Sequence, residues 1–338
     1  MTVAGIDEPA VSSWIAGRVD GAEPPFTFDL IPGGNSNLTY RVQGRGDADL
    51  ALRRPPLGNI LESAHDMARE FRVISALHGT GVPVPRALGL CTDTEVNGAP
   101  FYVMDFVDGL VLHDRGAGER IPASRRPPVG RSVIEVLATL HSLDPDEIGL
   151  GDLGRREGYL ERQLHRWTRQ FEASKQRELP IMDRVRTLLQ DGVPRQERAG
   201  VVHGDYRLGN LIVAGGRVRA VVDWELCTLG DPLADLGYLA NDWIAPGEPT
   251  LWRSSAIQAG GFQNRRRLIE EYAELSTLDV SRIGYYQAFQ SWRLAAILEG
   301  VYSRYLHGAM ANIAGVDLEG LARSVERLAD HALEQLES

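Results

Sequence analysis

The sequence of 338 residues has almost no lysine, little cysteine and no long apolar run. Lys175 is the only lysine among 36 basic residues, and all the others are arginines. Any chemistry that usually relies on a lysine elsewhere in the chain must therefore use arginine or do without. The two cysteines, Cys91 and Cys227, lie far apart without CxxC spacing or Cys/His neighbours, which argues against a disulfide framework and a zinc site.

No stretch of about 18 apolar residues occurs, and the N-terminus lacks a basic start followed by an apolar segment. We therefore expect no membrane span, no secretory signal and a cytoplasmic location. The net charge is -10, and the basic residues are scattered rather than gathered in one block. This pattern argues against nucleic acid as a partner, and the acidic balance weakly suits a cationic substrate. The oligomeric state is not indicated.

The first third of the chain has the pattern of a small antiparallel sheet. Short apolar-alternating runs and Gly-rich turns predict five strands, at 26–31, 38–42, 49–54, 86–91 and 100–107. Apolar residues near helical spacing predict one helix, over 63–78.

Beyond Gly109, long amphipathic patterns dominate. They predict helices at roughly 124–142, 156–173, 182–192, 263–276, 281–306 and 317–336. Segment 199–223 is the exception, with short strands joined by a loop and a Gly-Gly turn. We predict an α+β fold of two lobes: a β-rich lobe with one helix over 1–108, and a larger, mainly helical lobe over 109–338. Residues 1–20 and 114–123 are expected to be mobile.

The strongest chemical signal is HGDYRLGN at 203–210, a loop between two apolar strands. It places Asp205 and Asn210 five positions apart, with the spacing of the protein kinase pattern H-R-D-x-x-x-x-N. Phosphoryl transfer needs a carboxylate that orients the attacking hydroxyl and accepts its proton, and an oxygen ligand that helps to hold Mg²⁺. We assign Asp205 as the catalytic base and Asn210 as a metal ligand. The alternative is that both residues merely cap turns.

A second acidic element, VVDWE at 221–225, ends the next predicted strand. A kinase has its other metal-binding aspartate at this position, and Mg²⁺ prefers few protein carboxylates together with phosphates and water. Asp223 is therefore the principal candidate for a metal ligand. The alternative is that the two acids simply face solvent.

HGDYRLGN, VVDWE and the following GDPLADL at 230–236 resemble the aminoglycoside phosphotransferase/choline kinase superfamily, over nearly the whole chain. GGNSNLTY at 33–40, LRRPP at 52–56 and PFYVMDFVDG at 100–109 are most similar to the kinase-like domain fused to some acyl-CoA dehydrogenases and to its free-standing bacterial relatives. The resemblance implies a protein-kinase-like fold with ATP and Mg²⁺ bound, although the sequence does not distinguish ATP from GTP.

The resemblance also implies nucleotide-binding residues. The turn that covers the phosphates corresponds to Gly33, Gly34, Ser36 and Asn37, where glycine lets backbone N–H groups approach an anion. The hinge that would bind the adenine corresponds to Met104, Phe106 and Val107.

The lysine–glutamate pair of protein kinases corresponds to Arg53 and Glu70. Because lysine is absent here, Arg53 is expected to supply the charge that binds the phosphates, although a guanidinium is bulkier than an ammonium. Arg54 is a poorer substitute, since neighbouring strand residues point to opposite faces. The alternative for Arg53 and Glu70 is a plain surface ion pair.

The site of the acceptor is the least defined. It is expected among helices 124–192 and 263–336 and the segment between them, which offer several aromatic residues: Trp167, Trp243, Trp252, Tyr285, Tyr286, Trp292 and Tyr302. An aminoglycoside needs an acidic cleft, whereas an anionic acyl thioester needs arginines such as Arg265-Arg266-Arg267, a run that otherwise forms a solvated helix face. Asp231 and Asp235 are expected to stabilise the loop after Asp223 and to cap the next helix.

These observations predict an ATP- and Mg²⁺-dependent phosphotransferase, an aminoglycoside phosphotransferase-like kinase that phosphorylates a hydroxyl of a small molecule. Two alternatives stay open. One is a kinase of a hydroxyacyl-CoA or related metabolite, and the other is a nucleotide-binding pseudokinase that has lost turnover at Arg53.

Overall fold

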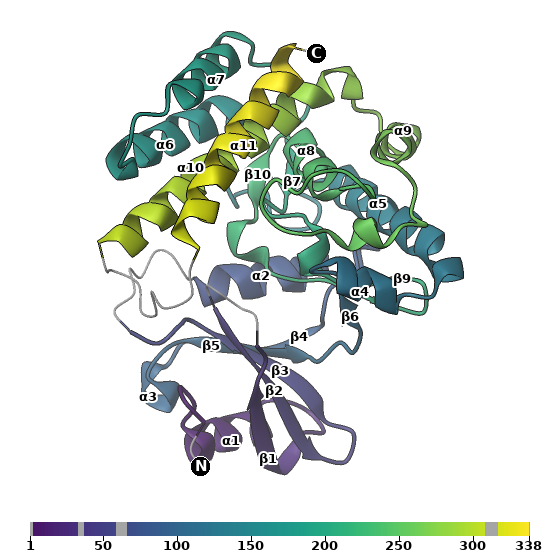
Figure 1. Cartoon of the computed structure of the whole chain (residues 1–338). Coiled ribbons are helices and arrows are strands. Elements are labelled where there is room, and N and C mark those ends of the chain that lie inside the picture. The colour runs from purple at the N-terminus through teal and green to yellow at the C-terminus, as the bar shows by residue number, and fades with distance from the viewer. Residues whose placement is uncertain (1–2, 33–36, 59–65, 308–316, 338) are drawn as a thin grey trace. The chain divides into compact units, whose positions relative to one another are not determined.

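The computed structural model describes residues 3–32, 37–58, 66–307 and 317–337 (Figure 1). The chain forms two compact units, one of residues 1–109 with 219–227, and one of residues 110–218 with 228–338. The division passes through strand β9 (Arg217–Val221). Asp223 therefore belongs to the first unit, whereas Asp205 and Asn210 belong to the second.

The first unit contains an antiparallel sheet with strand order β1-β2-β3-β5-β4. The strands are β1 (Glu23–Leu30), β2 (Leu38–Arg45), β3 (Asp49–Arg54), β4 (Ala87–Cys91) and β5 (Phe101–Asp105). The five predicted strands are thus confirmed. Strand β5 lies between β3 and β4, with Val103 opposite Leu52. Their side chains, with Tyr40 and Val42 of β2, are fully buried and form the centre of the core.

Helix α2 (Met67–Leu77) packs against β4 and β5, and its predicted start at 63 falls outside the described residues. The carboxylate of Asp66 caps the helix by accepting the N–H of Arg69 at 2.9 Å. Glu70 lies on the buried face of α2, among apolar residues such as Val73. The apolar stripe of this helix therefore carries a carboxylate into the interior of the first unit.

The expectation that residues 1–20 are mobile is wrong for helix α1 (Glu8–Ala16), which packs on the same core. Val11 and Ile15 are fully buried, and the Trp14 ring meets the Phe101 ring edge-on, with centroids 5.0 Å apart. Two apolar residues at helical spacing are too short a pattern to predict a helix from sequence.

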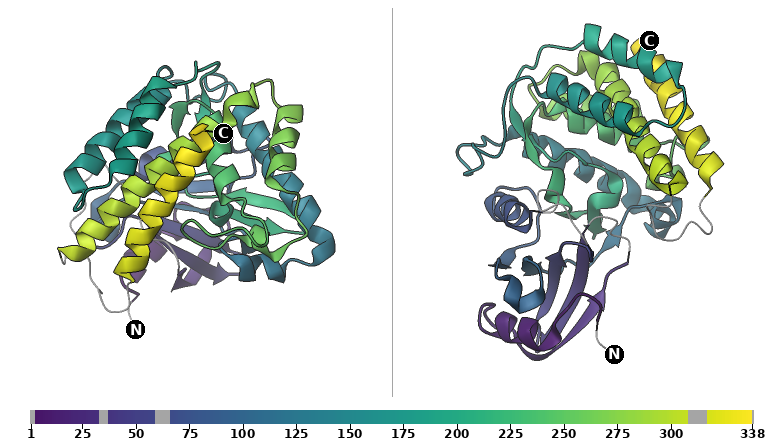
Figure 2. Two further views of the ribbon diagram at one scale, coloured as in Figure 1. Left: turned by 45° about the horizontal axis from the view of Figure 1, so that its top comes forward. Right: turned by 90° about the vertical axis from the view of Figure 1, so that its left-hand side faces the viewer.

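The second unit is mainly helical, as predicted. The six predicted helices correspond to α5 (Arg126–Ser142), α6 (Tyr159–Ser174), α7 (Pro180–Asp191), α9 (Arg265–Leu275), α10 (Ile283–Leu306) and α11 (Leu318–Glu337). Helix α10 contacts α6, α7, α8 (Leu233–Asp242) and α11, and Figure 2 shows α10 and α11 running side by side. The described part of the chain contains no helix with the length and apolar character of a membrane span.

Several short elements were not predicted: α3 (Thr94–Asn97) in the first unit, and α4 (Arg115–Arg120) and α8 in the second. Helix α4 occupies a segment expected to be mobile. The remaining strands form two small sheets, one of β7 (Gly200–Val202) with β10 (Thr228–Gly230), and one in the order β6 (Leu110–Val111), β8 (Leu211–Ala214) and β9. Because β7 and β8 flank residues 203–210, both ends of this loop are anchored in sheets.

We predict that Ile15→Ala lowers the free energy of unfolding by about 2–5 kcal/mol, because it removes a fully buried side chain from the core. Ser13→Ala, on the exposed side of the same helix, is the matched control and should change stability by less than about 0.5 kcal/mol. Denaturant unfolding followed by circular dichroism measures both. Equal midpoints for the two variants would show that α1 is not part of the core.

Candidate active site

A buried ion pair joins a strand and a helix of the first unit. The Nε of Arg53 on β3 donates to Oε2 of Glu70 on α2 at 3.0 Å. The side chains are 11% and 1% exposed, so this is not the plain surface ion pair that the sequence left as an alternative. Arg54 donates instead to the backbone carbonyls of Gly5 and Asn97, and only Arg53 of the two contacts Glu70.

Asp223 contacts the same guanidinium, because Nη2 of Arg53 donates to its Oδ1. The N–H of Trp224 donates to Oε1 of Glu70 at 3.1 Å, so Glu70 binds both Arg53 and the Asp223 segment. Asp223 has φ 70°, the only left-handed backbone among the described non-glycine residues. Such conformations cluster at functional sites, where the surrounding contacts hold them. Arg53, Glu70 and Asp223 thus form one cluster.

The protonation of this cluster follows from its burial. Burial raises the pKa of the Glu70 carboxyl, and the charge of Arg53 opposes this rise. Burial alone would favour the neutral guanidinium, but the nearby carboxylates raise the pKa of Arg53 above its usual value. Arg53 therefore stays a cation with two carboxylate partners. Asp223, 26% exposed, is the more accessible of the two.

The other predicted nucleotide-binding residues are only partly described. Gly33, Gly34 and Ser36 lie outside the described residues. Asn37 is buried, and its Nδ2 donates to Oε2 of Glu225 at 3.0 Å, which links the end of this turn to the Asp223 segment.

Part of the backbone of the predicted hinge is hydrogen-bonded within the sheet. Met104 pairs with Ala51 of β3 and Ala87 of β4, so its backbone lies inside the sheet. The N–H of Phe106 donates to the carbonyl of Asp49 at 3.0 Å. The expectation that the whole segment offers free backbone groups to an adenine is therefore wrong for Met104 and for the N–H of Phe106, whereas Val107 follows the last of these bonds.

In the second unit, Asp205 and Asn210 lie together as predicted. The Nδ2 of Asn210 donates to the carbonyl of Asp205 at 2.9 Å and to its Oδ2 at 2.7 Å. The Nε of Arg207 also donates to Oδ2, at 3.2 Å. Within the described residues Oδ1 of Asp205 receives no hydrogen bond. The carboxylate is thus held by one oxygen, and the other is available to a ligand.

Asp235 binds the backbone of this loop, and the role that the sequence predicted for Asp235 is wrong. Its two carboxylate oxygens accept the N–H groups of His203 at 2.6 Å and of Gly204 at 2.9 Å. Asp235 lies within α8 and stabilises the loop before Asp205 rather than the loop after Asp223. Asp231 precedes α8, and its Oδ1 accepts the N–H of Leu233, the first residue of the helix, at 3.1 Å.

Three further residues of this loop's surroundings were missed, because they lie far from it in sequence. His141, buried, lies between the hydroxyl of Tyr272 at 2.8 Å and Oδ2 of Asp235 at 3.5 Å. Asp242 accepts the N–H of Leu208 at 2.9 Å, and Arg293 donates to the carbonyl of Gly204 at 3.1 Å. These contacts fix the backbone on both sides of Asp205. No local motif marks them in the sequence.

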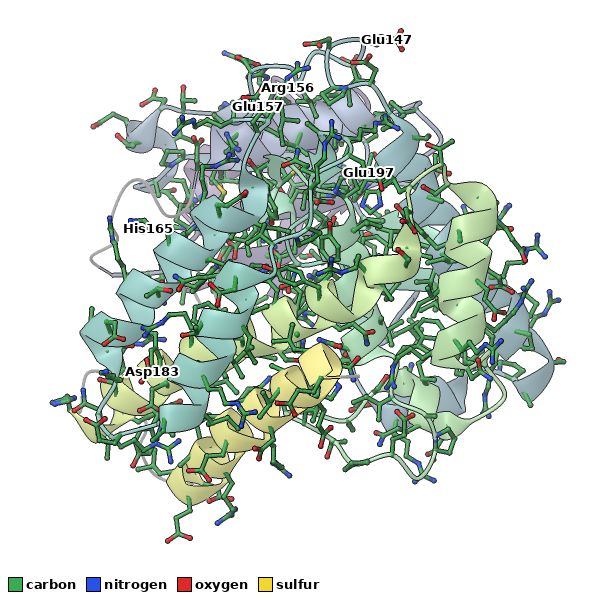
Figure 3. All side chains as sticks on the ribbon, turned by 90° about the horizontal axis from the view of Figure 1, so that it is seen from above. Glu147, Arg156, Glu157, His165, Asp183 and Glu197 are labelled. Atoms are coloured by element: carbon green, nitrogen blue, oxygen red, sulfur yellow. The ribbon has the colours of Figure 1, made fainter. Side chains whose placement is uncertain are left out.

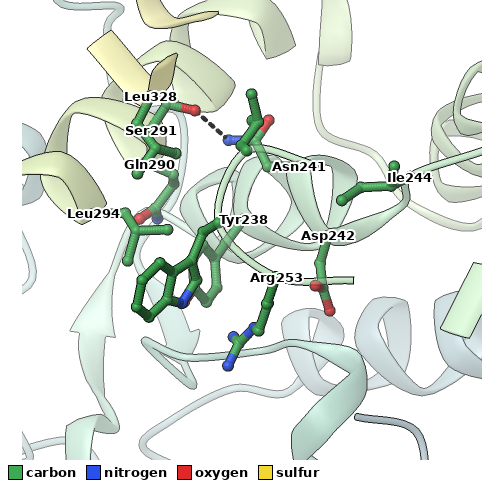
Figure 4. A pocket seen from close by; sticks show the side chains of 11 residues that line it. Tyr238, Asn241, Asp242, Ile244, Arg253, Gln290, Ser291, Leu294 and Leu328 are labelled. Atoms are coloured by element: carbon green, nitrogen blue, oxygen red, sulfur yellow. Dashed lines mark hydrogen bonds between the residues drawn. The ribbon is translucent and has the colours of Figure 1, made fainter. Parts of the chain in front are cut away.

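A pocket adjoins the loop (Figure 4). Its walls come from α8, the segment after it, α10 and α11, and they are mostly apolar, with Tyr238, Asp242, Trp252 and Arg253 as the larger polar or aromatic members. Asp242 both lines this pocket and binds Leu208 of the loop. Asp242 therefore connects the pocket with the loop that carries Asp205.

Most of the residues expected in the acceptor site instead pack in the core or form ion pairs. Among the aromatic candidates, Trp252 lines the pocket, whereas Trp167, Trp243, Tyr285, Tyr286 and Trp292 are buried in the core. The arginine run is ion-paired: Arg265 with Glu248, Arg266 with Glu270, and Arg267 with Glu271 and Glu274. The alternative of a helix face stabilised by charge pairs fits this run better than an anion channel.

The residues assigned to Mg²⁺ have suitable donor atoms. Asn210 uses Nδ2 for Asp205, which leaves its Oδ1 as the atom for a cation, and Asp223 has a second carboxylate oxygen besides the one bonded to Arg53. The described residues contain no group of three or more His, Cys, Asp or Glu that could hold an ion alone. Each of the two residues therefore has a hard oxygen of the kind that Mg²⁺ takes beside water and phosphate ligands.

Comparisons with known proteins agree with this geometry. Acyl-CoA dehydrogenase family member 10 of Mus musculus is 37% identical over 306 residues, which cover 88% of this chain and 28% of that protein. A crystal structure of a candidate aminoglycoside phosphotransferase from Ralstonia eutropha JMP134 is 32% identical, with a TM-score of 0.81, and covers 97% of this chain and 98% of that chain.

The aminoglycoside phosphotransferase APH(4)-Ia, solved with AMP-PNP and hygromycin B, has a TM-score of 0.63 at 14% identity over 96% of this chain and 98% of its own, which shows a shared fold. The chain spans well under half the length of the curated relatives it matches. The family model described as the phosphotransferase enzyme family matches residues 27–274. The predicted resemblance and the α+β fold are thus confirmed, and the chain is an enzyme that belongs to the phosphotransferase enzyme family.

Proposed function

We propose that this chain transfers a phosphoryl group from ATP, with Mg²⁺, to a hydroxyl of a small molecule. The observation that carries the proposal is the state of Asp205, whose Oδ2 is held by Arg207 and Asn210 while Oδ1 is available. In this reaction Oδ1 would orient the acceptor hydroxyl and accept its proton as the oxygen attacks phosphorus. The contacts of Asp235 and Arg293 with the loop keep this carboxylate in place.

The first unit would bind the nucleotide. Phosphate oxygens would compete with Asp223 for Nη2 of Arg53, while Glu70 keeps hold of Nε. Asp223 would then be free to join Asn210 as a ligand of Mg²⁺, which neutralises charge on the phosphates when bound. The turn of Gly33, Gly34, Ser36 and Asn37 would cover the phosphates, and Val107, with the side chains of Met104 and Phe106, would contact the adenine.

The acceptor has two candidate classes. The fold shared with an aminoglycoside phosphotransferase supports a polyhydroxylated amine. The identity to an acyl-CoA dehydrogenase family member supports a hydroxyacyl-CoA or related metabolite. A pseudokinase is the less favoured function, because a protein that only binds nucleotide has no need for the ordered contacts of Asp205.

The first test is turnover with Asp205→Asn. Without a carboxylate to accept the proton, kcat should fall by about 10²–10⁴-fold while ATP binding stays unchanged. The assay is Mg²⁺-dependent ATP consumption in the presence of aminoglycosides, amino alcohols, sugars and hydroxyacyl-CoAs. Asp183→Asn on α7 removes an exposed carboxylate of the same unit and is the control (Figure 3). Undiminished turnover in Asp205→Asn would refute the mechanism, and ATP binding without stimulation by any acceptor would favour the pseudokinase.

The second test concerns Arg53. Arg53→Ala should lower the free energy of unfolding by about 3–5 kcal/mol, because it leaves Glu70 buried without its cation. In the double variant Arg53→Ala/Glu70→Ala, the loss of unfolding free energy should be smaller than the sum of the losses in the two single variants. The reason is that the double variant leaves neither side chain buried without its partner. Both quantities come from denaturant unfolding.

ATP binding separates a role in the site from a role in folding alone. By calorimetry, Arg53→Ala should bind ATP at least about tenfold more weakly, because it loses a charge-assisted hydrogen bond to phosphate. Arg53→Lys should recover part of this loss, since it keeps the charge. If the double variant were folded and bound ATP as well as the wild type, Arg53 would be only a structural residue.

A further inference from the structure

Tyr238 and Arg253 line the pocket next to the loop of the predicted base. Burial raises the pKa of the Tyr238 phenol, and the charges of Arg253, Arg293 and Arg207 oppose this rise. The Arg293 guanidinium lies 5.8 Å from the centroid of the Tyr238 ring. Among the described residues the charged side chains that line the pocket are Arg253 and Asp242, and the charge of Arg253 opposes the rise in the pKa of Asp242 that burial causes.

Two of these arginines are committed to the catalytic loop. Arg207 donates to Asp205, and Arg293 donates to the carbonyl of Gly204 and to Oε1 of Gln290. Arg253 lines the pocket and, among residues 3–32, 37–58, 66–307 and 317–337, has neither a hydrogen bond nor an ion pair. Figure 4 shows Arg253 and Asp242 extending in the same direction, and Asp242 accepts the N–H of Leu208 through Oδ2. Because no hydrogen bond or ion pair joins Arg253 to Asp242 within the described residues, the guanidinium N–H groups of Arg253 are available to a ligand.

Most of the wall around Arg253 is apolar. Leu251, Ile244, Leu294 and Leu328 line the pocket, and Trp252, which is 39% exposed, adds an indole surface, while Asn241, Gln290 and Ser291 are its uncharged polar members. Several acids of the second unit lie outside the pocket: Glu147, Glu157 and Glu197 in Figure 3 are exposed, and Asp183 is partly exposed. Total charge therefore does not describe this pocket.

We propose that Arg253 is a specificity-determining residue that binds an anionic group, a carboxylate or a phosphate, carried by the acceptor close to the hydroxyl that is phosphorylated. The aliphatic and indole walls hold the apolar part of the same molecule. A fork of guanidinium N–H groups matches either anion with two hydrogen bonds, whereas an ammonium group of an acceptor would be repelled by the same guanidinium. The inference rests on the proposed function only in treating this pocket as the acceptor site.

The test compares ligands that differ only in charge. Binding of 3-hydroxybutyrate and of its neutral amide to the whole chain is titrated by ligand-observed NMR, with glycerol 3-phosphate and glycerol as the phosphate pair and choline as the cation. The proteins are the wild type, Arg253→Gln, Arg253→Lys and the control Arg266→Gln, which removes an exposed arginine outside the pocket.

At least one anion should bind the wild type and Arg266→Gln about tenfold more tightly than its neutral counterpart. Arg253→Gln should lose this preference, and Arg253→Lys should regain part of it. A comparison of the carboxylate pair with the phosphate pair shows which of the two anions Arg253 binds. Equal binding of charged and neutral partners, tighter binding of choline, no saturable binding of either anion, or an unchanged preference in Arg253→Gln would each overturn the proposal.

Turnover of the best acceptor found is a second measurement. A larger KM in Arg253→Gln for the anionic acceptor alone supports the proposal. An equal loss of kcat for charged and neutral acceptors would overturn it, because Arg253 would then act on the transferred phosphoryl group. Binding is measured without turnover, so a chain that prefers anions yet transfers no phosphate would refute the kinase while leaving the role of Arg253 intact.

Discussion

The buried guanidinium of Arg53 is the constraint on which the first unit depends. A cation in the protein interior is tolerated only when carboxylates and hydrogen bonds surround it. Its planar fork serves two carboxylates at once, Glu70 through Nε and Asp223 through Nη2, which a single ammonium would hold less rigidly. This shared contact, with the bond from Trp224 to Glu70, explains why residues 219–227 join the first unit although they follow loop 203–210 in sequence.

In the second unit, aspartate side chains accept backbone N–H groups of loop 203–210 that are not paired within a strand or helix. Residues 203–210 leave strand β7 and cannot satisfy their N–H groups within a sheet, so Asp235 accepts two of them and Asp242 a third. Each bond runs from a backbone N–H group to a carboxylate oxygen. These contacts hold the loop in one conformation, which the proposed role of Asp205 requires, because preorganised polar groups stabilise a reacting centre.

Charge shows how far total composition can differ from a local site. The chain carries -10, and this first suggested a cationic substrate. Exposed acids such as Glu147 and Glu157 contribute to this total, whereas the charged side chains that line the pocket, among the described residues, are Arg253 and Asp242. Charges at the pocket act on a ligand at close range, whereas exposed charges farther than about 8 Å are screened at physiological salt. We therefore expect the charges at the pocket, rather than the net charge, to decide which acceptor the proposed site favours.

The sequence by itself determined the strands of the first unit, the long helices of the second, the Asp205–Asn210 loop and the family. These signals are local: the periods of strands and helices and the five-residue spacing are carried by neighbouring residues. Only the tertiary structure decided that Arg53 contacts Asp223 across 170 positions, that Asp235 holds the loop rather than capping a helix, and that Arg253 lines the pocket without an ion pair to any described residue. Such contacts depend on how distant segments pack against one another, which no local pattern encodes.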